Sequence, residues 1–221
     1  MTDKVALPES YSSERVFLLP FCPSQPPFNS ADGELQDLLS YLYKRTKEDG
    51  LLEILFTGME PPSKDRFIYM LYTKPLIVGF LKPHNGEVPQ AIGFGWLMEL
   101  EGEPGRRKAN FGFSFFRQYW GSADVREATW MTLRWWFEEM GCDVLFGPTL
   151  KRNLLAQRFA QEMGFRKIAE IPMFFSGTNG LENCVLVSMT KDEFHQIQER
   201  REIETENLVQ IRTDVTAATG D

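Results

Sequence analysis

The pattern of hydrophobic and polar positions changes period along the chain, which predicts a mixture of helices and strands. Apolar residues recur at three- and four-residue spacings, as on one face of a helix, in residues 31–49, 123–140 and 154–163. A further helix is predicted from about Ser63 to Tyr72, because proline and serine at its start suit a helix N-terminus. Short apolar runs predict strands at residues 15–21, 76–81, 91–100, 109–116, 143–147, 171–176 and 184–189.

The order of these elements predicts a mixed α/β sheet with helices on both faces. Turn residues separate 76–81, 91–100 and 109–116, including Asn85-Gly86, so these three strands should form an antiparallel meander. The strand-helix-strand unit that follows favours a parallel pair in the middle of the sheet. Gly177-Thr178-Asn179-Gly180 should join the last two strands as a closing hairpin.

Composition supports one domain and narrows the classes of partner. The chain has 221 residues of which 43% are hydrophobic, enough for one large core, which we assign to residues 1–190. Residues 191–221 are charged and threonine-rich, and we expect a partly helical, partly disordered appendage. A net charge of −7 argues against nucleic-acid binding and leaves cationic amine substrates open.

Cysteine usage and the absence of apolar segments of membrane-spanning length favour a soluble cytoplasmic protein without a membrane partner. The three cysteines are Cys22, Cys142 and Cys184, and their number and wide separation suggest neither a disulfide scaffold nor a metal site. The first ten residues lack the basic and apolar segments of a secretory signal.

The main candidate for chemistry is the turn between the strand 109–116 and the helix that begins near Ala123. It carries Gln118, Gly121 and Ala123 in the pattern Gln-x-x-Gly-x-Ala. A helix N-terminus offers unpaired N–H donors and the positive end of a dipole, so the turn could hold an anionic group on its backbone. The alternative is that the small residues simply allow a tight connection.

Two motifs in this region resemble the GNAT superfamily of acetyl-CoA-dependent N-acetyltransferases. The branch that acetylates ribosomal-protein N-termini commonly reads Tyr-Trp-Gly-x-Gly-x-x-x-Glu-Ala, and Tyr119 to Ala128 follows it with alanine at 123 in place of the second glycine. Asn153 and the pair Gly164-Phe165 match a second motif of the branch in spacing. Small divergent proteins of this type also occur in tailed phages and prophages, an origin that the resemblance permits.

The resemblance implies a fold, a co-substrate and a set of residues that bind it. Strands 109–116 and 143–147 should splay apart, so that the pantetheine arm of acetyl-CoA lies between them. Asn153 should help to fix the pantetheine or the acetyl group, although its position before Leu154 also suits a helix cap. The residues expected to bind the cofactor are Phe115, Phe116, Gln118, Tyr119, Trp120, Gly121, Ser122, Ala123 and Asn153.

The catalytic residues depart from the family pattern. Asn110 stands where the branch often has a glutamate base, and Ala156 where it has a serine that can protonate the departing thiolate. Glu99 is then the nearest candidate base and Tyr119 the nearest hydroxyl, although Glu99 could simply end a strand at solvent.

Two functions remain open from the sequence. The first is an acetyl-CoA-dependent N-acetyltransferase that acts on a primary amine of a protein or a small molecule, without a metal. The second is a GNAT-fold protein with impaired catalysis that binds CoA or serves as a structural component. Asn110 and Ala156 favour the second, whereas the intact turn and Asn153 favour cofactor binding, and we lean towards an enzyme. The acceptor and the oligomeric state are not determined by the sequence.

Overall fold

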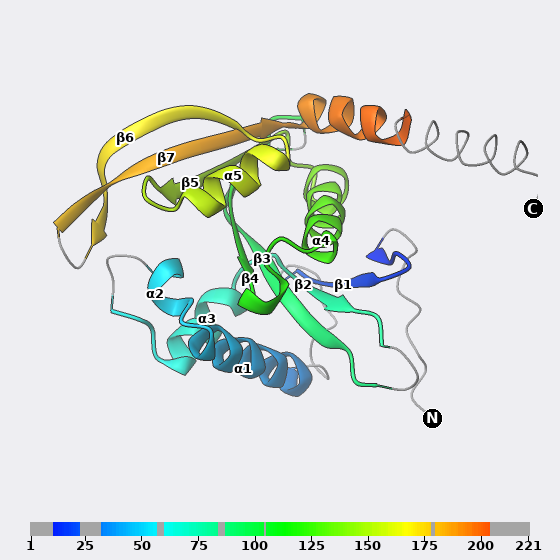
Figure 1. Ribbon diagram of the computed structural model, residues 1–221, viewed down its shortest axis with the longest axis vertical. Helices are drawn as coiled ribbons and strands as arrows, with labels where there is room; N and C mark the ends of the chain where they lie inside the picture. Colours follow the sequence, from blue (N-terminus) through cyan, green and yellow to red (C-terminus); the bar gives the residue numbers. More distant parts are fainter. Residues whose placement is uncertain are drawn as a thin grey trace, which may run out of the picture.

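The computed structural model describes residues 11–22, 32–56, 60–83, 87–103, 105–177 and 180–203. Within them, seven strands form one sheet in the order β1-β2-β3-β4-β5-β7-β6 (Figure 1). In that part of the chain β4 and β5 pair in parallel, and all other neighbours are antiparallel. The strands are β1 (Val16–Phe21), β2 (Leu76–Leu81), β3 (Gln90–Glu101), β4 (Lys108–Phe115), β5 (Val144–Leu150), β6 (Arg166–Gly177) and β7 (Gly180–Thr190).

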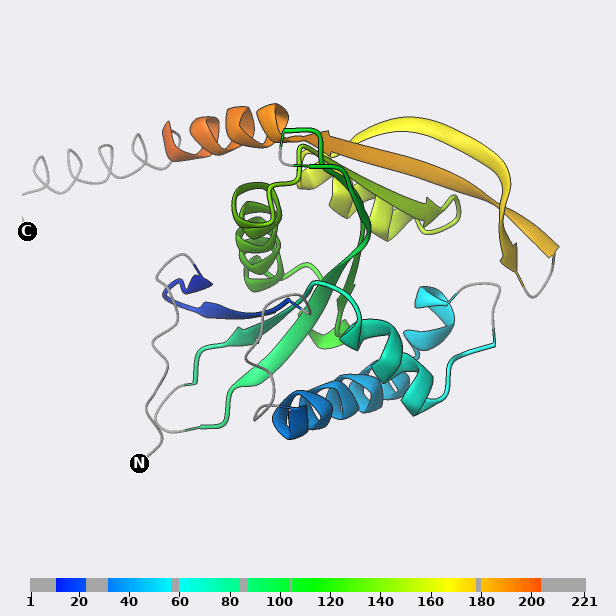
Figure 2. The ribbon, with the colours of Figure 1, turned by 180° about the vertical axis from the view of Figure 1, so that it is seen from behind.

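Helices cover both faces of the sheet, as predicted. The first three lie together against one face of the β1–β4 half, and α4 lies on the opposite face (Figures 1 and 2). The helices are α1 (Asp32–Glu48), α2 (Leu52–Leu55), α3 (Lys64–Tyr72), the 3-10 turn η2 (Arg117–Tyr119), α4 (Ala123–Arg134), the π-helix η3 (Trp135–Glu139) and α5 (Leu154–Glu162).

Each face of the sheet has its own hydrophobic core, and β4 contributes to both. Ala109, Phe111 and Phe113 pack on the α4 face, whereas Phe116, just after the strand, is fully buried against α1 and α3. Side chains of successive strand residues point to opposite faces, so this alternation follows from strand geometry. The odd-numbered residues of β4 therefore face α4, and the even-numbered ones face the α1–α3 side.

The predicted order of elements is confirmed, and one helix differs in form. Residues 123–140 were expected to be one α-helix, but the last turn is π-helical. Trp135, Trp136 and Phe137 are consecutive, bulky and all at most 5% exposed. A regular α-helix turns 100° per residue and cannot direct three successive rings into one core, whereas a wider turn brings them closer to one side. The Asn85-Gly86 turn lies outside the described residues.

The chain continues as a helix after β7, through residues 191–203. Phe194 is 1% exposed and stacks on Phe137, with ring centroids 5.0 Å apart, and it also contacts Trp130 of α4 at 5.6 Å. The helical part of the predicted appendage is thus packed into the core on the α4 face. The remainder, 204–221, lies outside the described residues.

Candidate functional site

Strands β4 and β5 pair over a short distance and then separate. The paired residues are Lys108–Asn110 on β4 and Val144–Phe146 on β5. Both strands continue, β4 to Phe115 and β5 to Leu150, without further pairing between them in the described chain. Because β5 remains paired with β7 along its whole length, the sheet itself opens at this point. The splay that the resemblance implied is confirmed.

Pro148 gives a local reason for the end of pairing. The amide of Val144 donates to the carbonyl of Arg107 on the β4 side, at 3.2 Å, whereas that of Lys151 donates to Asn183 on the β7 side, at 2.9 Å. Backbone N–H and C=O groups alternate in direction along a strand, so those of the even-numbered β5 residues point towards β4. Pro148 therefore faces β4, and it has no N–H to offer to a neighbouring strand.

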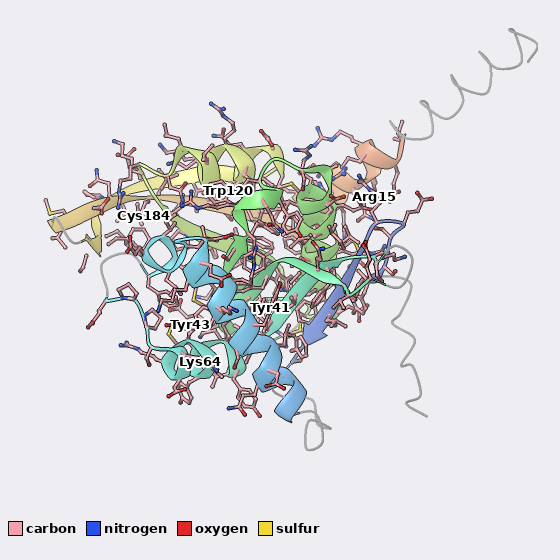
Figure 3. The ribbon with its side chains drawn as sticks, turned by 60° about the horizontal axis from the view of Figure 1, so that its bottom comes forward. Arg15, Tyr41, Tyr43, Lys64, Trp120 and Cys184 are labelled. Carbon is pink, nitrogen blue, oxygen red and sulfur yellow. The ribbon has the colours of Figure 1, made fainter. Side chains whose placement is uncertain are left out.

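The open half of β4 presents an unpaired backbone edge to the gap. Phe116 donates its N–H to Ile92 of β3 at 3.0 Å, which shows that the even-numbered residues bond to β3. The N–H and C=O groups of Phe111, Phe113 and Phe115 consequently point towards β5. The carbonyl of Phe115 accepts a hydrogen bond of 2.7 Å from the indole of Trp120, which Figure 3 shows on the turn before α4. The rest of the edge is suited to an extended ligand with amide groups.

The gap leads at its outer end to the predicted anion-binding turn. Gly121 has φ +76°, a conformation that favours glycine, and the hydroxyl of Ser122 accepts from the amide of Val125 at 3.2 Å. This cap leaves the amides of Gly121, Ala123 and Asp124 without an acceptor among the described residues. They can donate to a phosphate at the positive end of the helix.

Charges around the turn are arranged to tolerate an anion. The two carboxylates in the first turns of α4, Asp124 and Glu127, both pair with Arg15, at 3.3 and 2.8 Å. The guanidinium of Arg126 is exposed and donates to the carbonyl of Gly121 at 3.0 Å. The acidic side chains are therefore compensated, and a cation lies beside the free amides.

The turn is also tethered to the end of α1. Arg117 donates its amide to the carboxylate of Asp49 at 2.8 Å and its Nε to the carbonyl of the same residue at 2.6 Å. Its guanidinium lies 5.0 Å from the centre of the Trp120 ring. Gln118, one of the predicted cofactor residues, accepts a long hydrogen bond of 3.5 Å from Arg45 of α1. The conformation of the turn therefore depends on contacts from the other face.

Glu99 lies at the inner end of the gap, where pairing between β4 and β5 stops. Its carboxylate accepts a hydrogen bond from the amide of Asn110, the last β4 residue paired with β5. Glu99 has φ +50° in an irregularity of the β3–β4 ladder. A left-handed glutamate is strained, and such strain and bulges are common at functional sites. Asn110 is even-numbered, so this pair lies on the α1–α3 face.

Tyr119, the other predicted catalytic residue, lies at the opposite end of β3. Its hydroxyl donates to Gln90 at 3.0 Å, and Gln90 is the first residue of β3, whereas Glu99 is close to the last. Gln90 and Glu99 are nine residues apart, which at about 3.3 Å per residue is about 30 Å. The structure does not bring the two side chains to one reacting centre.

Two further predicted cofactor residues have structural partners. Phe116 is fully buried, its N–H donates to Ile92, and its carbonyl accepts from Tyr119. No backbone group of Phe116 is left for a ligand within the described residues. Asn153 is the N-cap of α5, and its side-chain oxygen accepts from the amide of Ala156 at 3.2 Å.

Sequence reasoning missed three residues that shape the gap, namely Phe111, Gly147 and Pro148. Pro148, directly after the predicted strand 143–147, was a visible signal, since a proline cannot donate to a central ladder. The ring of Phe111 on β4 lies against the backbone of Gly147 on β5, and this contact between two strands had no local signal.

The sequence profile of the acetyltransferase (GNAT) domain family matches residues 29–166 of this chain. The chain belongs to the GNAT family. The match includes α1 to α5, both edges of the gap and the turn before α4. In the described part of this GNAT protein no helix is long and apolar enough to cross a membrane.

Solved structures of other GNAT proteins share the fold at low sequence identity. A probable GNAT acetyltransferase from Chromobacterium violaceum is 21% identical, with TM-score 0.61 over 86% of this chain and 90% of the other. A Vibrio cholerae spermidine N-acetyltransferase, in complex with CoA and spermine, is 14% identical, with TM-score 0.62 over 82% and 99%. A Vibrio fischeri ribosomal-protein-S5-alanine acetyltransferase is 16% identical, with TM-score 0.59 over 83% and 97%. A search of the curated proteins found no match.

Proposed function

We propose that this protein binds acetyl-CoA and transfers the acetyl group to a primary amine. The observation that carries the proposal is the continuity of the gap with the anion-binding turn. The edge of β4 that does not pair with β5 runs from Phe111 to Phe115, and the free amides of Gly121 and Ala123 follow it directly. This combination suits a ligand with an extended amide-bearing arm and a pyrophosphate, as in CoA.

The residues that would hold the cofactor act mainly through their backbones. The pyrophosphate would accept from the amides of Gly121, Ala123 and Asp124, with Arg126 near its charge. The pantetheine amides would pair with Phe113 and Phe115 on the edge of β4. Asn153 would contribute the NH₂ group of its side chain, because its oxygen is occupied by the cap. Trp120 would cover the outer end of the arm.

Glu99 is the proposed base. In this reaction the amine nitrogen bonds to the thioester carbonyl carbon, the carbon–sulfur bond breaks, and the amine loses a proton. Glu99 would take that proton, directly or through water, while Asn110 holds the carboxylate. Solvent would supply the proton for the thiolate, because Ala156 has no hydroxyl and Tyr119 lies far from Glu99.

A second function, CoA binding without catalysis, is favoured by one observation. The glutamate and serine expected from the family are replaced by Asn110 and Ala156, and Glu99 is exposed. In that case the fold and the cofactor site would serve a structural or interaction role. The acceptor of the first function would be a primary amine of a protein, such as a ribosomal-protein N-terminus, or of a small molecule.

Calorimetric titration with acetyl-CoA tests the proposed function. We expect the wild type to bind, and Gly121→Glu to bind at least about 100-fold more weakly, because a carboxylate and a strained backbone would occupy the turn. The matched control is Gly105→Glu. Gly105 also has positive φ, +89°, and an added Cβ would have nothing within 4 Å, as at Gly121. Equal losses in both variants would indicate general damage to the fold.

Turnover is tested separately by thiol release from acetyl-CoA with a panel of amines. Release that depends on an amine would establish the transferase. Binding of acetyl-CoA without release from any amine would favour the second function. Absence of binding to the folded wild type would reject both.

A further inference from the structure

The ring of Phe111 closes the inner end of the gap. Phe111 and Gly147 are the residues that directly follow the last backbone pair, Asn110 with Phe146. The Phe111 ring lies so close to the backbone of Gly147 that a Cβ at position 147 would overlap its Cζ and Cε1 atoms. The ring therefore reaches from β4 to β5 on the α4 face, at the point where the strands begin to separate.

Other aromatic rings support Phe111 from behind. Its ring centroid lies 4.7 Å from that of Phe165, 5.9 Å from Trp136 and 5.7 Å from Phe113. Phe165 and Trp136 are 4% and 0% exposed, so they belong to a closely packed core. Phe111 itself is partly exposed. The ring has little room to retreat into this core, and it lies at the point where the gap begins.

From this arrangement we infer that Phe111, seated on Gly147, limits the acyl group that the protein accepts to two or three carbons. The inference rests on the proposed function. Phosphates at Gly121 place the cofactor at the outer end of the gap, and Glu99 marks the inner end as the reacting end. The open stretch of β4 between them spans about 13 Å at 3.3 Å per residue. An acyl chain on the sulfur points onwards from the arm, towards the Phe111 ring.

The physical basis of this limit is steric overlap between the acyl chain and the Phe111 ring, which the packed core holds in place. Each added methylene of the acyl chain would have to displace the ring, and the packed rings behind it oppose that movement. Discrimination by one methylene in an apolar pocket is commonly about 10-fold or more. Gly147 contributes to this limit because the absence of a side chain there lets the Phe111 ring lie across the gap.

Binding of an acyl-CoA series without an amine tests the inference independently of turnover. Calorimetry would compare CoA, acetyl-CoA, butyryl-CoA and hexanoyl-CoA. We expect the wild type to bind butyryl-CoA at least about 10-fold more weakly than acetyl-CoA. Phe111→Ala should bring the two affinities within about twofold of each other. Gly147→Ala should act in the opposite direction, because its methyl group pushes the ring into the gap and increases the discrimination.

Trp130→Ala is the control for loss of an aromatic ring from the core on the same face. The Trp130 ring packs on Phe194, with ring centroids 5.6 Å apart, rather than on Phe111, so its removal should leave the acyl preference unchanged. Phe111→Leu serves if the alanine variant does not fold, and it should relax the preference partly. Equal binding of acetyl- and butyryl-CoA by the wild type would overturn the inference while leaving the proposed function intact, as would an unchanged preference in folded Phe111→Ala. Failure of CoA and all thioesters to bind would instead reject the proposed function, and the inference with it.

Discussion

The junction of β4 and β5 has a closed half and an open half, and the two are built from different interactions. In the closed half, the backbones pair and Asp143 adds a side-chain acceptor for the amide of Arg107 at 2.7 Å. In the open half, Pro148 removes a donor, and aromatic rings from β4 occupy the α4 face. The same two strands thus stabilise the fold at their paired end and expose backbone groups at their separated end.

The comparison shows that particular residues keep the strands apart in the open half, just as others keep them paired in the closed half. Unpaired backbone is costly when buried, so a strand edge persists only where water or a ligand can reach it. Here Pro148 prevents pairing on the β5 side of the gap, and the capped N-terminus of α4 lies at the outer end of the β4 side. If this division is correct, substitutions in the closed half should affect stability, and those in the open half should affect binding or turnover.

The first prediction concerns the chemical protection of the closed half. Cys142 is 0% exposed, and burial raises the pKa of its thiol to about 11. Arg107 lowers this pKa and Asp143 raises it, each by less than burial does. A raised thiol pKa leaves less thiolate, so alkylation at pH 8 should be at least about 100-fold slower than in the urea-unfolded chain. Mass spectrometry of iodoacetamide-treated protein measures this. Rapid labelling of Cys142 in the native protein would show that the closed half opens in solution.

The second prediction concerns the point where the halves meet. Glu99→Gln should lower kcat by about 100-fold and leave acetyl-CoA affinity unchanged, because it removes a base without altering the cofactor site. The adjacent Glu101 pairs with Lys108 at 3.0 Å, and Glu101→Gln is a matched control that should retain activity. Steady-state kinetics with an amine that the wild type acetylates would measure kcat for both variants. Equal activity of the two variants would remove Glu99 from the mechanism.

The third prediction tests the closed half thermodynamically. Asp143→Ala removes the acceptor of the Arg107 amide and should lower the free energy of unfolding by about 1–3 kcal/mol. Asp143→Asn keeps an acceptor oxygen and should lose less. Urea unfolding measures both, and acetyl-CoA titration should show affinities within about twofold of the wild type. A larger effect on binding than on stability would contradict the division between the halves.

The fourth prediction is the smallest and concerns the open half of β4. The hydroxyl of Ser114 is buried and lacks a hydrogen-bond partner among the described residues. Ser114→Ala should therefore leave the free energy of unfolding unchanged or raise it by up to about 1 kcal/mol, since a buried unpaired polar group costs stability. A clear loss of stability in urea unfolding would indicate that this hydroxyl has a partner in solution.

The sequence predicted the elements and the turn because both depend on nearby residues. Gly121 and Ser122 are adjacent to the amides that they free or cap, and the alternation of periods reflects each strand and helix separately. The relation between distant residues was less accessible. Glu99 and Tyr119 were both predicted to be catalytic, but β3 runs antiparallel to β4 and places them at opposite ends.

The inner end of the gap was not predictable from local pattern. Phe111 is one of several phenylalanines in the predicted strand 109–116, and its contact with Gly147 depends on the register of β4 against β5. Pro148 carried a signal, but its meaning depends on which neighbour its missing N–H would have faced. The π-helical turn likewise results from competition among three consecutive rings for one core rather than from the propensity of any one of them.

The position of β7 has a consequence for the order in which the protein can fold during synthesis. β7 lies between β5 and β6, and Phe194 follows it into the core on the α4 face. A ribosome that has released the gap, the turn and all of α5 has still not delivered the strand that covers one edge of β5. The nascent chain must therefore keep that edge unpaired until β7 itself has been synthesised, and β6 can join the sheet only then, because β7 is the strand that links it to β5.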